Sequence, residues 1–178
     1  MQNDNRATGD DRTVRQPGER LGPALLAMAL AGAVLVLLAW GVLARAGRVG
    51  PPTLAMAVVP LTAALALRLR LSRLVPDVVF GAIDTGLLTI PALIGGWHFG
   101  VIGAVLGGVV GDSITDGIAG FFEGGIASWL RRHGIEESRT AAGSGLGKMT
   151  GCLAGCGLVL TVAELFGLVP AGGLLAGS

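Results

Sequence analysis

Residues 78–129 read VVFGAIDTGLLTIPALIGGWHFGVIGAVLGGVVGDSITDGIAGFFEGGIASW, an apolar, glycine-rich stretch that carries four acidic residues, Asp84, Asp112, Asp116 and Glu123. A carboxylate in the middle of a bilayer costs about 2.5–3.5 kcal/mol on insertion scales, whereas a leucine returns only about 0.3–0.6 kcal/mol. A helix with two or three such acids therefore needs partners that shield them from lipid, or a wet pathway that solvates them. The positions of these acids are the main indication of function in the sequence.

The composition of the whole chain is typical of a membrane protein. Of its 178 residues, 52% are hydrophobic and 31 are glycine, and long apolar runs indicate membrane-spanning helices. We therefore expect the lipid bilayer as a partner. The formal net charge is only +1, which gives no indication of a nucleic-acid partner. No nucleophile stands with a base in a catalytic pattern, so we expect neither an enzyme nor a permanently bound cofactor.

Apolar segments along the chain predict an all-α, polytopic membrane bundle of about five transmembrane helices. They cover residues 21–44, 53–67, 75–96, 101–130 and 145–169. The second segment is short, and Pro60 predicts a kink in it. The third carries Gly81, Asp84, Gly86 and Pro91, so we expect its helix to be interrupted. In the fourth, residues 101–121 are expected to cross the membrane and residues 122–129 to continue along the headgroups.

The same segments suggest three regions and an orientation. Residues 1–20 are polar and predict a disordered cytoplasmic tail, residues 21–74 a two-helix hairpin, and residues 75–178 a three-helix core. With the N-terminus in the cytoplasm, four arginines of the tail and three in each of the two other cytoplasmic segments lie inside, against only Arg45 and Arg48 outside. This asymmetry predicts a multi-pass protein of the cell inner membrane with a cytoplasmic N-terminus and an external C-terminus.

Three of the acids lie on one side of the fourth segment. At about 100° per residue, Asp112, Asp116 and Glu123 form one narrow stripe. Two carboxylates one turn apart in a low dielectric repel, and a divalent cation such as Mg²⁺, Mn²⁺ or Fe²⁺, or a proton, relieves that repulsion. We therefore predict Asp84, Asp112 and Asp116 as cation ligands on an ion path that includes Glu123. The alternative is structural: the acids, Glu123 above all, cap helices or pair with cytoplasmic arginines.

Glycine recurs every four residues in the last two apolar segments. Small residues at this spacing let two helix backbones approach closely. We predict that both series are helix-packing seams. The series consist of Gly103, Gly107 and Gly111 in the fourth segment, and of Gly143, Gly147, Gly151 and Gly155 in the fifth.

Sulfur-containing side chains share one face of the fifth segment, opposite its glycines. They are Met149, Cys152 and Cys156, at spacing i, i+3 and i+7. Sulfur ligands prefer softer metals, which makes the three residues candidate metal ligands. The alternative is that they fill a helix contact as small packing residues; neither interpretation includes a disulfide framework.

Two segments of the sequence resemble signatures of the vacuolar iron transporter family. They read VPDVVFGAIDTGLLT and TDGIAGFFEGGIA. That family has a segment of the type F-G-A-N-D-G-L in its first helix and A-D-G-x-S-M-A-x-G in its second. The matches are Phe80, Gly81, Ala82 and Asp84 in the first of these, and Asp116, Gly117 and Ala119 in the second. The resemblance implies a five-helix, dimeric exporter of Fe²⁺ or Mn²⁺ that exchanges metal for protons, with Asp84 on the path.

The chain also departs from that family. Ile83 replaces the asparagine, Thr85 precedes the glycine, and Gly120 stands where the methionine belongs. The glutamate-rich cytoplasmic insert is absent, and the two matching segments lie in the third and fourth apolar segments instead of the first and second. Because this methionine and this insert are both missing, the functions that they have in the family are in doubt for this chain.

The sequence thus predicts a membrane protein that moves a divalent metal cation or protons through an intramembrane carboxylate site. Five spans are few to enclose a pathway, so we expect a homo-oligomer, as a dimer. The alternative is a non-transporting structural or assembly protein with glycine-mediated helix packing. A short distance between Asp84 and Asp112 would favour a shared site, whereas acids at opposite membrane faces would favour the scaffold.

Overall fold

The computed structural model describes residues 21–45, 47–132 and 140–169, and the side chains of these residues except 21 and 121–132. The predicted tail of residues 1–20 and the side chain of Glu123 lie outside this description. Within it, every regular element is a helix, as the sequence predicts. The helices are α1 (Leu21–Ala44), α2 (Gly50–Met56), α3 (Val58–Ala66), α4 (Leu71–Arg132) and α5 (Ala141–Leu165).

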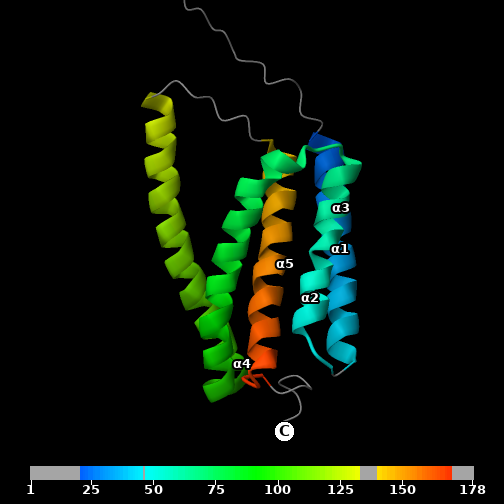
Figure 1. Ribbon diagram of the computed structural model, residues 1–178, viewed down its shortest axis with the longest axis vertical. Helices are drawn as coiled ribbons and strands as arrows, with labels where there is room; N and C mark the ends of the chain where they lie inside the picture. The colour runs from blue at the N-terminus through cyan, green and yellow to red at the C-terminus, as the bar shows by residue number, and fades with distance from the viewer. Residues whose placement is uncertain (1–20, 46, 133–139, 170–178) are drawn as a thin grey trace, which may run out of the picture.

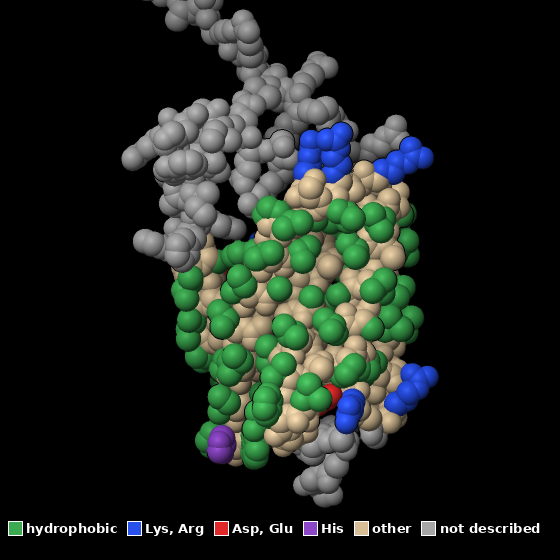
Figure 2. All heavy atoms as spheres, viewed as in Figure 1, with side chains coloured by type: hydrophobic (Ala, Val, Ile, Leu, Met, Phe, Trp, Pro, Cys, Tyr) green, Lys and Arg blue, Asp and Glu red, His purple; other side chains and the backbone are tan. Residues whose placement is uncertain are grey.

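Three of these helices, α1, α4 and α5, are long and apolar enough to cross a membrane. Residues 50–66 form a shorter apolar helical stretch. The helices stand side by side with their long axes roughly aligned (Figure 1). Apolar side chains cover the middle of the visible surface, and the described lysine and arginine side chains lie toward its two ends (Figure 2). A surface of this kind suits lipid around the middle and water at both ends.

Helix α4 is two helices joined at a bend. Gly100 has φ 62° and ψ −146°, a backbone conformation outside the helical region that essentially only glycine adopts. The chain reverses there, and we call residues 71–99 the first arm and residues 101–132 the second arm (Figure 1). The arms correspond to the third and fourth apolar segments of the sequence.

The predicted interruption of the third segment was wrong. The first arm is helical throughout residues 71–99, although Pro76 and Pro91 lie inside it. Glycine and proline are tolerated within membrane helices when neighbouring helices compensate for the lost interactions. Here Gly81 lies against the backbone of Lys148 in α5, and Pro91 lies against Gly107 in the second arm. Packing on two sides thus keeps the arm helical despite the helix-breaking tendency of its glycine and proline residues.

The second apolar segment divides into two helices at Ala57, three residues before its proline, and Ala57 itself keeps helical dihedral angles, φ −60° and ψ −20°. Helix α2 ends at Met56 and α3 begins at Val58, with Pro60 in the first turn of α3. Proline cannot donate a hydrogen bond to the carbonyl four residues earlier, and its ring collides with that carbonyl. The continuous helix therefore gives way just upstream of Pro60, where the first turn of a new helix tolerates proline.

Helix α5 contacts the four other helices (Figure 1). Along its contact with the first arm, Gly151 lies against the backbone of Val78 and Ala82, and Gly155 against that of Ala82. A Cβ atom at Gly147 would lie 2.8 Å from the Cβ of Asp77. These positions have no room for a larger side chain.

Helix α2 packs against another side of α5. A Cβ atom at Gly157 would lie 2.6 Å from the Cα of Leu54, and one at Gly50 would lie 2.6 Å from the Cα of Thr161. Near the other end of α5, buried Ala64, Leu74 and Leu146 form a small core between α3, the first arm and α5. α5 is thus packed closely on both flanks.

The two arms of α4 form an antiparallel pair whose register is set by glycines. Across the bend, Gly103 faces Gly95, Gly107 faces Pro91 and Gly111 faces Leu88. The next positions at the same spacing are Thr115 and Ala119, which are larger. The arms diverge toward their far ends (Figure 1). The end of the glycine series therefore coincides with the opening between the arms.

Candidate functional site

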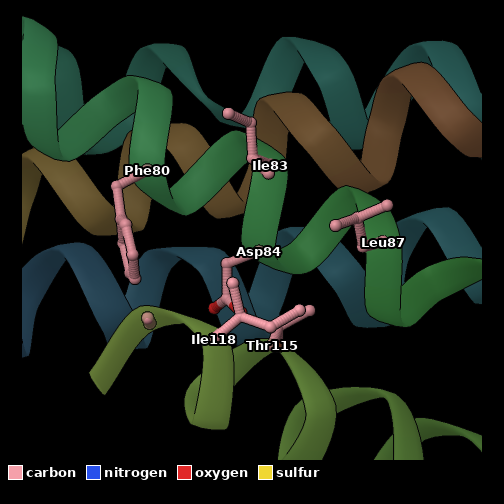
Figure 3. A pocket seen from close by; sticks show the side chains of 7 residues that line it. Phe80, Ile83, Asp84, Leu87, Thr115 and Ile118 are labelled. Atoms are coloured by element: carbon pink, nitrogen blue, oxygen red, sulfur yellow. The ribbon is translucent and has the colours of Figure 1, made fainter. Parts of the chain in front are cut away.

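Where the arms separate, they enclose an open cleft of about 290 Å³. Its walls are almost entirely apolar. The lining residues are Phe80, Ile83, Asp84 and Leu87 from the first arm, and Thr115, Ile118 and Ala119 from the second. Figure 3 shows Asp84 pointing from the first arm toward Thr115 and Ile118, with Phe80 beside it on the same arm. Asp84 is the acidic residue of this lining.

The structure brings Asp84 together with Asp112 and Asp116. One carboxylate oxygen from each of the three lies within 4.8 Å of the others. Asp84 is partly buried, whereas Asp112 and Asp116 are exposed on the second arm. The three residues predicted as cation ligands thus form one cluster at the edge of the cleft, which we call the acidic cluster.

The register of the arms explains why these residues meet. Gly111 faces Leu88, so residues one turn further along the second arm come opposite Asp84 on the first. Thr115 occupies that opposing position, and Asp112 and Asp116 flank it in the sequence. Thr115 donates its hydroxyl hydrogen bond to the carbonyl of Asp112, at 3.1 Å. This bond lies within the helix and involves a backbone carbonyl, so it does not occupy the carboxylates of Asp112 and Asp116.

The acidic cluster has no direct ion-pair partner within the described part of the chain. Atom Oδ1 of Asp84 is buried and accepts no hydrogen bond there. A buried, unpaired carboxylate oxygen costs free energy that a cation or proton donor can recover. No described arginine or lysine forms an ion pair with Asp84, Asp112 or Asp116. The arginine pairing considered as the structural alternative is thus absent for these acids among the described residues.

The candidate sulfur ligands do not join this cluster. Cys152 and Cys156 are free, partly buried thiols on α5. In the described ranges, neither belongs to a group of histidine, cysteine and acidic side chains close enough to hold one ion. Met149 packs against the small core around Leu146. The packing interpretation of these residues is consistent with their positions.

One member of the predicted glycine series differs from the others. A Cβ atom at Gly143 would meet only the hydroxyl of Thr140, at 2.8 Å. That hydroxyl accepts a hydrogen bond from the backbone N–H of Gly143, at 3.1 Å, and so caps the start of α5. Gly143 therefore lies within a helix cap instead of a contact between two helices.

Two further acids escaped the sequence analysis. Asp77 is only 3% exposed and accepts a hydrogen bond from the hydroxyl of Ser144 on α5, at 2.9 Å. Glu164, near the end of α5, accepts hydrogen bonds through Oε1 from the backbone N–H groups of Val49 and Gly50, at 2.6 and 3.0 Å. The apolar context of both acids was a visible signal, but their partners are distant in the sequence.

The fold and the site together define a helical protein with three helices long and apolar enough to cross a membrane, an apolar cleft between the two arms of one hairpin, and a cluster of three acids at the edge of that cleft. No protein-family model matches the chain, and no curated protein or solved structure shows significant similarity to it.

Proposed function

We propose that this protein binds a divalent cation of the Mn²⁺ or Fe²⁺ type in the acidic cluster and moves it through the membrane, with protons as the alternative or coupled cargo. The observation that carries the proposal is the convergence of Asp84, Asp112 and Asp116 within 4.8 Å, although they come from two arms of a hairpin. Carboxylate oxygens are the ligands that Mg²⁺, Mn²⁺ and similar ions prefer.

The electrostatic environment of the three carboxylates favours binding of a cation. Three carboxylates close together in a low dielectric repel one another, and a divalent ion converts this repulsion into attraction. Metal–oxygen distances of about 2.0–2.2 Å place two oxygens on one ion no more than about 4.4 Å apart. The three carboxylate oxygens lie within 4.8 Å of one another, so a bound ion would draw these oxygens slightly closer or retain water among its ligands. The divergent arms give the cleft room for such closure.

The surroundings also support movement rather than permanent storage. The cleft is open, and two of its three acids are exposed. In a membrane, an exposed aspartate on an apolar helix costs about 2.5–3.5 kcal/mol. Polar groups of a second copy of the chain that hydrogen-bond to Asp112 and Asp116 would reduce that cost, which favours a homodimer. In this proposal the chain crosses the membrane five times, with the N-terminus inside. The five spans are α1, α2 together with α3, the two arms of α4, and α5.

The resemblance to vacuolar iron transporters supports the proposal through Asp84, the one residue to which it carries a path role; Asp116 matches the second signature more loosely. Both residues belong to the acidic cluster. A transporter of iron or manganese coupled to protons is therefore the specific form of the proposal. The main support for this proposal is the acidic cluster, and the resemblance is additional support.

Flux measurements test this proposal. Purified protein is reconstituted into vesicles that contain a metal-sensitive dye, and Mn²⁺ or Fe²⁺ uptake is followed with and without a pH gradient. We expect uptake to fall at least about tenfold in Asp112→Asn and in Asp116→Asn, because each variant removes a charged ligand. Ser113→Ala, on the same turn but outside the cluster, is the matched control. Unchanged flux in both aspartate variants would remove the assigned role.

A non-transporting scaffold is the second candidate, favoured by the close glycine contacts along α4 and α5. It predicts that Gly107→Leu and Gly151→Leu abolish assembly while no cation moves under any condition. Metal uptake by the wild-type protein, lost in the aspartate variants, would exclude it.

A further inference from the structure

Lys148 is the sole lysine of the chain, and its side chain lies over Phe80, which lines the cleft. Its backbone lies directly against the first arm: a Cβ atom at Gly81 would be 2.7 Å from the carbonyl oxygen of Lys148. Its Nζ atom lies over the ring of Phe80, 4.8 Å from the ring centroid. An ammonium at this distance is attracted to the face of the ring. Phe80 thus fixes the position of a positive charge.

The same phenylalanine lines the cleft. Phe80 and Asp84 are one helical turn apart on the first arm, and both contribute to the cleft wall (Figure 3). Residues at this spacing are neighbours on a helix, with Cβ atoms about 5–6 Å apart. The ammonium of Lys148 therefore lies next to Phe80, a residue of the cleft wall, and Phe80 is one turn from Asp84.

Two sets of acids lie on the elements packed around this lysine. One is the acidic cluster, whose nearest member along the first arm is Asp84. The other is Asp77, which packs against Gly147, the residue before Lys148, and is already bonded to Ser144. On α5 itself, the single acidic residue is Glu164, about four turns further along the helix.

We propose that Lys148 sets the cation affinity of the cleft. Its fixed positive charge offsets part of the negative charge of the acidic cluster, and so weakens binding of the divalent ion enough to permit release. The inference rests on the proposed function, because it assigns Lys148 a role in cation binding at that same site. Lys148 acts through charge and position and is not itself a ligand.

A double-mutant cycle on metal-free protein tests the charge coupling. We expect Lys148→Met to lower the apparent melting temperature by about 2–4 °C in the wild type, but by less than about 1 °C in an Asp84→Asn background. Lys148→Arg, which keeps the charge, should match the wild type and serves as the second variant if Lys148→Met does not fold. An effect that vanishes in Asp77→Asn but persists in Asp84→Asn would assign the lysine to Asp77 and overturn the proposal.

Mn²⁺ titration of the full-length protein tests the consequence for affinity. We expect Lys148→Met to bind Mn²⁺ about tenfold more tightly than the wild type, and Lys148→Arg to bind like the wild type. Glu164→Gln, which changes a distant acid of the same helix, should leave the affinity unchanged. Equal Mn²⁺ affinity in the wild type and Lys148→Met overturns this inference alone. Absence of Mn²⁺ binding in every variant overturns the proposed function and this inference with it.

Discussion

Gly95 and Gly103 lie backbone against backbone on either side of the bend in α4. A Cβ atom on Gly95 would collide with the carbonyl of Gly103, and one on Gly103 would lie 2.6 Å from the Cβ of Phe99. The arms can approach this closely because neither glycine carries a side chain. This contact begins the register that leads to Asp84.

A leucine at Gly103 should therefore destabilise the hairpin. Overpacking a close contact costs about 1–3 kcal/mol, and backbone atoms are the obstacle here, so we expect the upper end of that range. Gly117→Leu is the matched control on the same arm, because a Cβ there meets nothing within 4 Å. Thermal unfolding in detergent should show a large loss for Gly103→Leu and no loss for Gly117→Leu. Equal behaviour of the two variants would contradict the packing of the arms.

The bend itself depends on Gly100. Its φ of 62° with ψ −146° is strained for any residue with a Cβ, and nothing lies within 4 Å to add a steric clash. Gly100→Ala should therefore cost about 1–3 kcal/mol through backbone strain alone. Gly108→Ala, where the new Cβ meets only the Cβ of Ala92 at 3.9 Å, should be neutral or slightly stabilising. Melting temperatures of the two variants check this difference, and an unaffected Gly100→Ala would argue against the bend.

The attachment of α2 to α5 depends on Glu164. Its Oε1 atom accepts hydrogen bonds from two backbone N–H groups, those of Val49 and Gly50. Glu164→Ala leaves both donors without this acceptor, which should cost about 1–3 kcal/mol. Glu164→Gln keeps a carbonyl acceptor and should lose less. Thermal unfolding of both variants measures the difference; a larger loss for glutamine than for alanine would refute the capping role.

Cation binding at the acidic cluster should stabilise the fold. A ligand at 100 times its dissociation constant adds about 2.7 kcal/mol, which raises the melting temperature of a chain of this size by about 5 °C or more. We expect this shift with Mn²⁺ in the wild type and its loss in Asp84→Asn. Ser113→Ala should retain the shift, because its hydroxyl bonds only to the carbonyl of Val109 within the helix. A shift that survives in Asp84→Asn would place the ion elsewhere.

Local signals in the chain predict much of the architecture. The apolar runs indicate membrane helices because hydropathy is a property of short segments, and the helix bounds differ from the prediction by a few residues. The interrupted third segment is the main error. Pro91 has the same breaker signal in any helix, and only its packing against Gly107 shows why the first arm continues.

The candidate site was predictable in its members but not in its assembly. Asp112 and Asp116 share a helix face by spacing alone, and Asp84 is conspicuous because it stands in apolar sequence. The pairing of Ser144 with Asp77, and of Glu164 with Val49, joins residues far apart in the chain. No periodicity in one sequence reports such contacts.

The sequence by itself determined that this is a helical membrane protein with acids in apolar surroundings, since composition and spacing act locally. Only the tertiary structure decided that Asp84 meets Asp112 and Asp116. That meeting requires the chain to reverse at Gly100 and the arms to pair through Gly103, Gly107 and Gly111, and both follow from backbone contacts between segments remote in the chain.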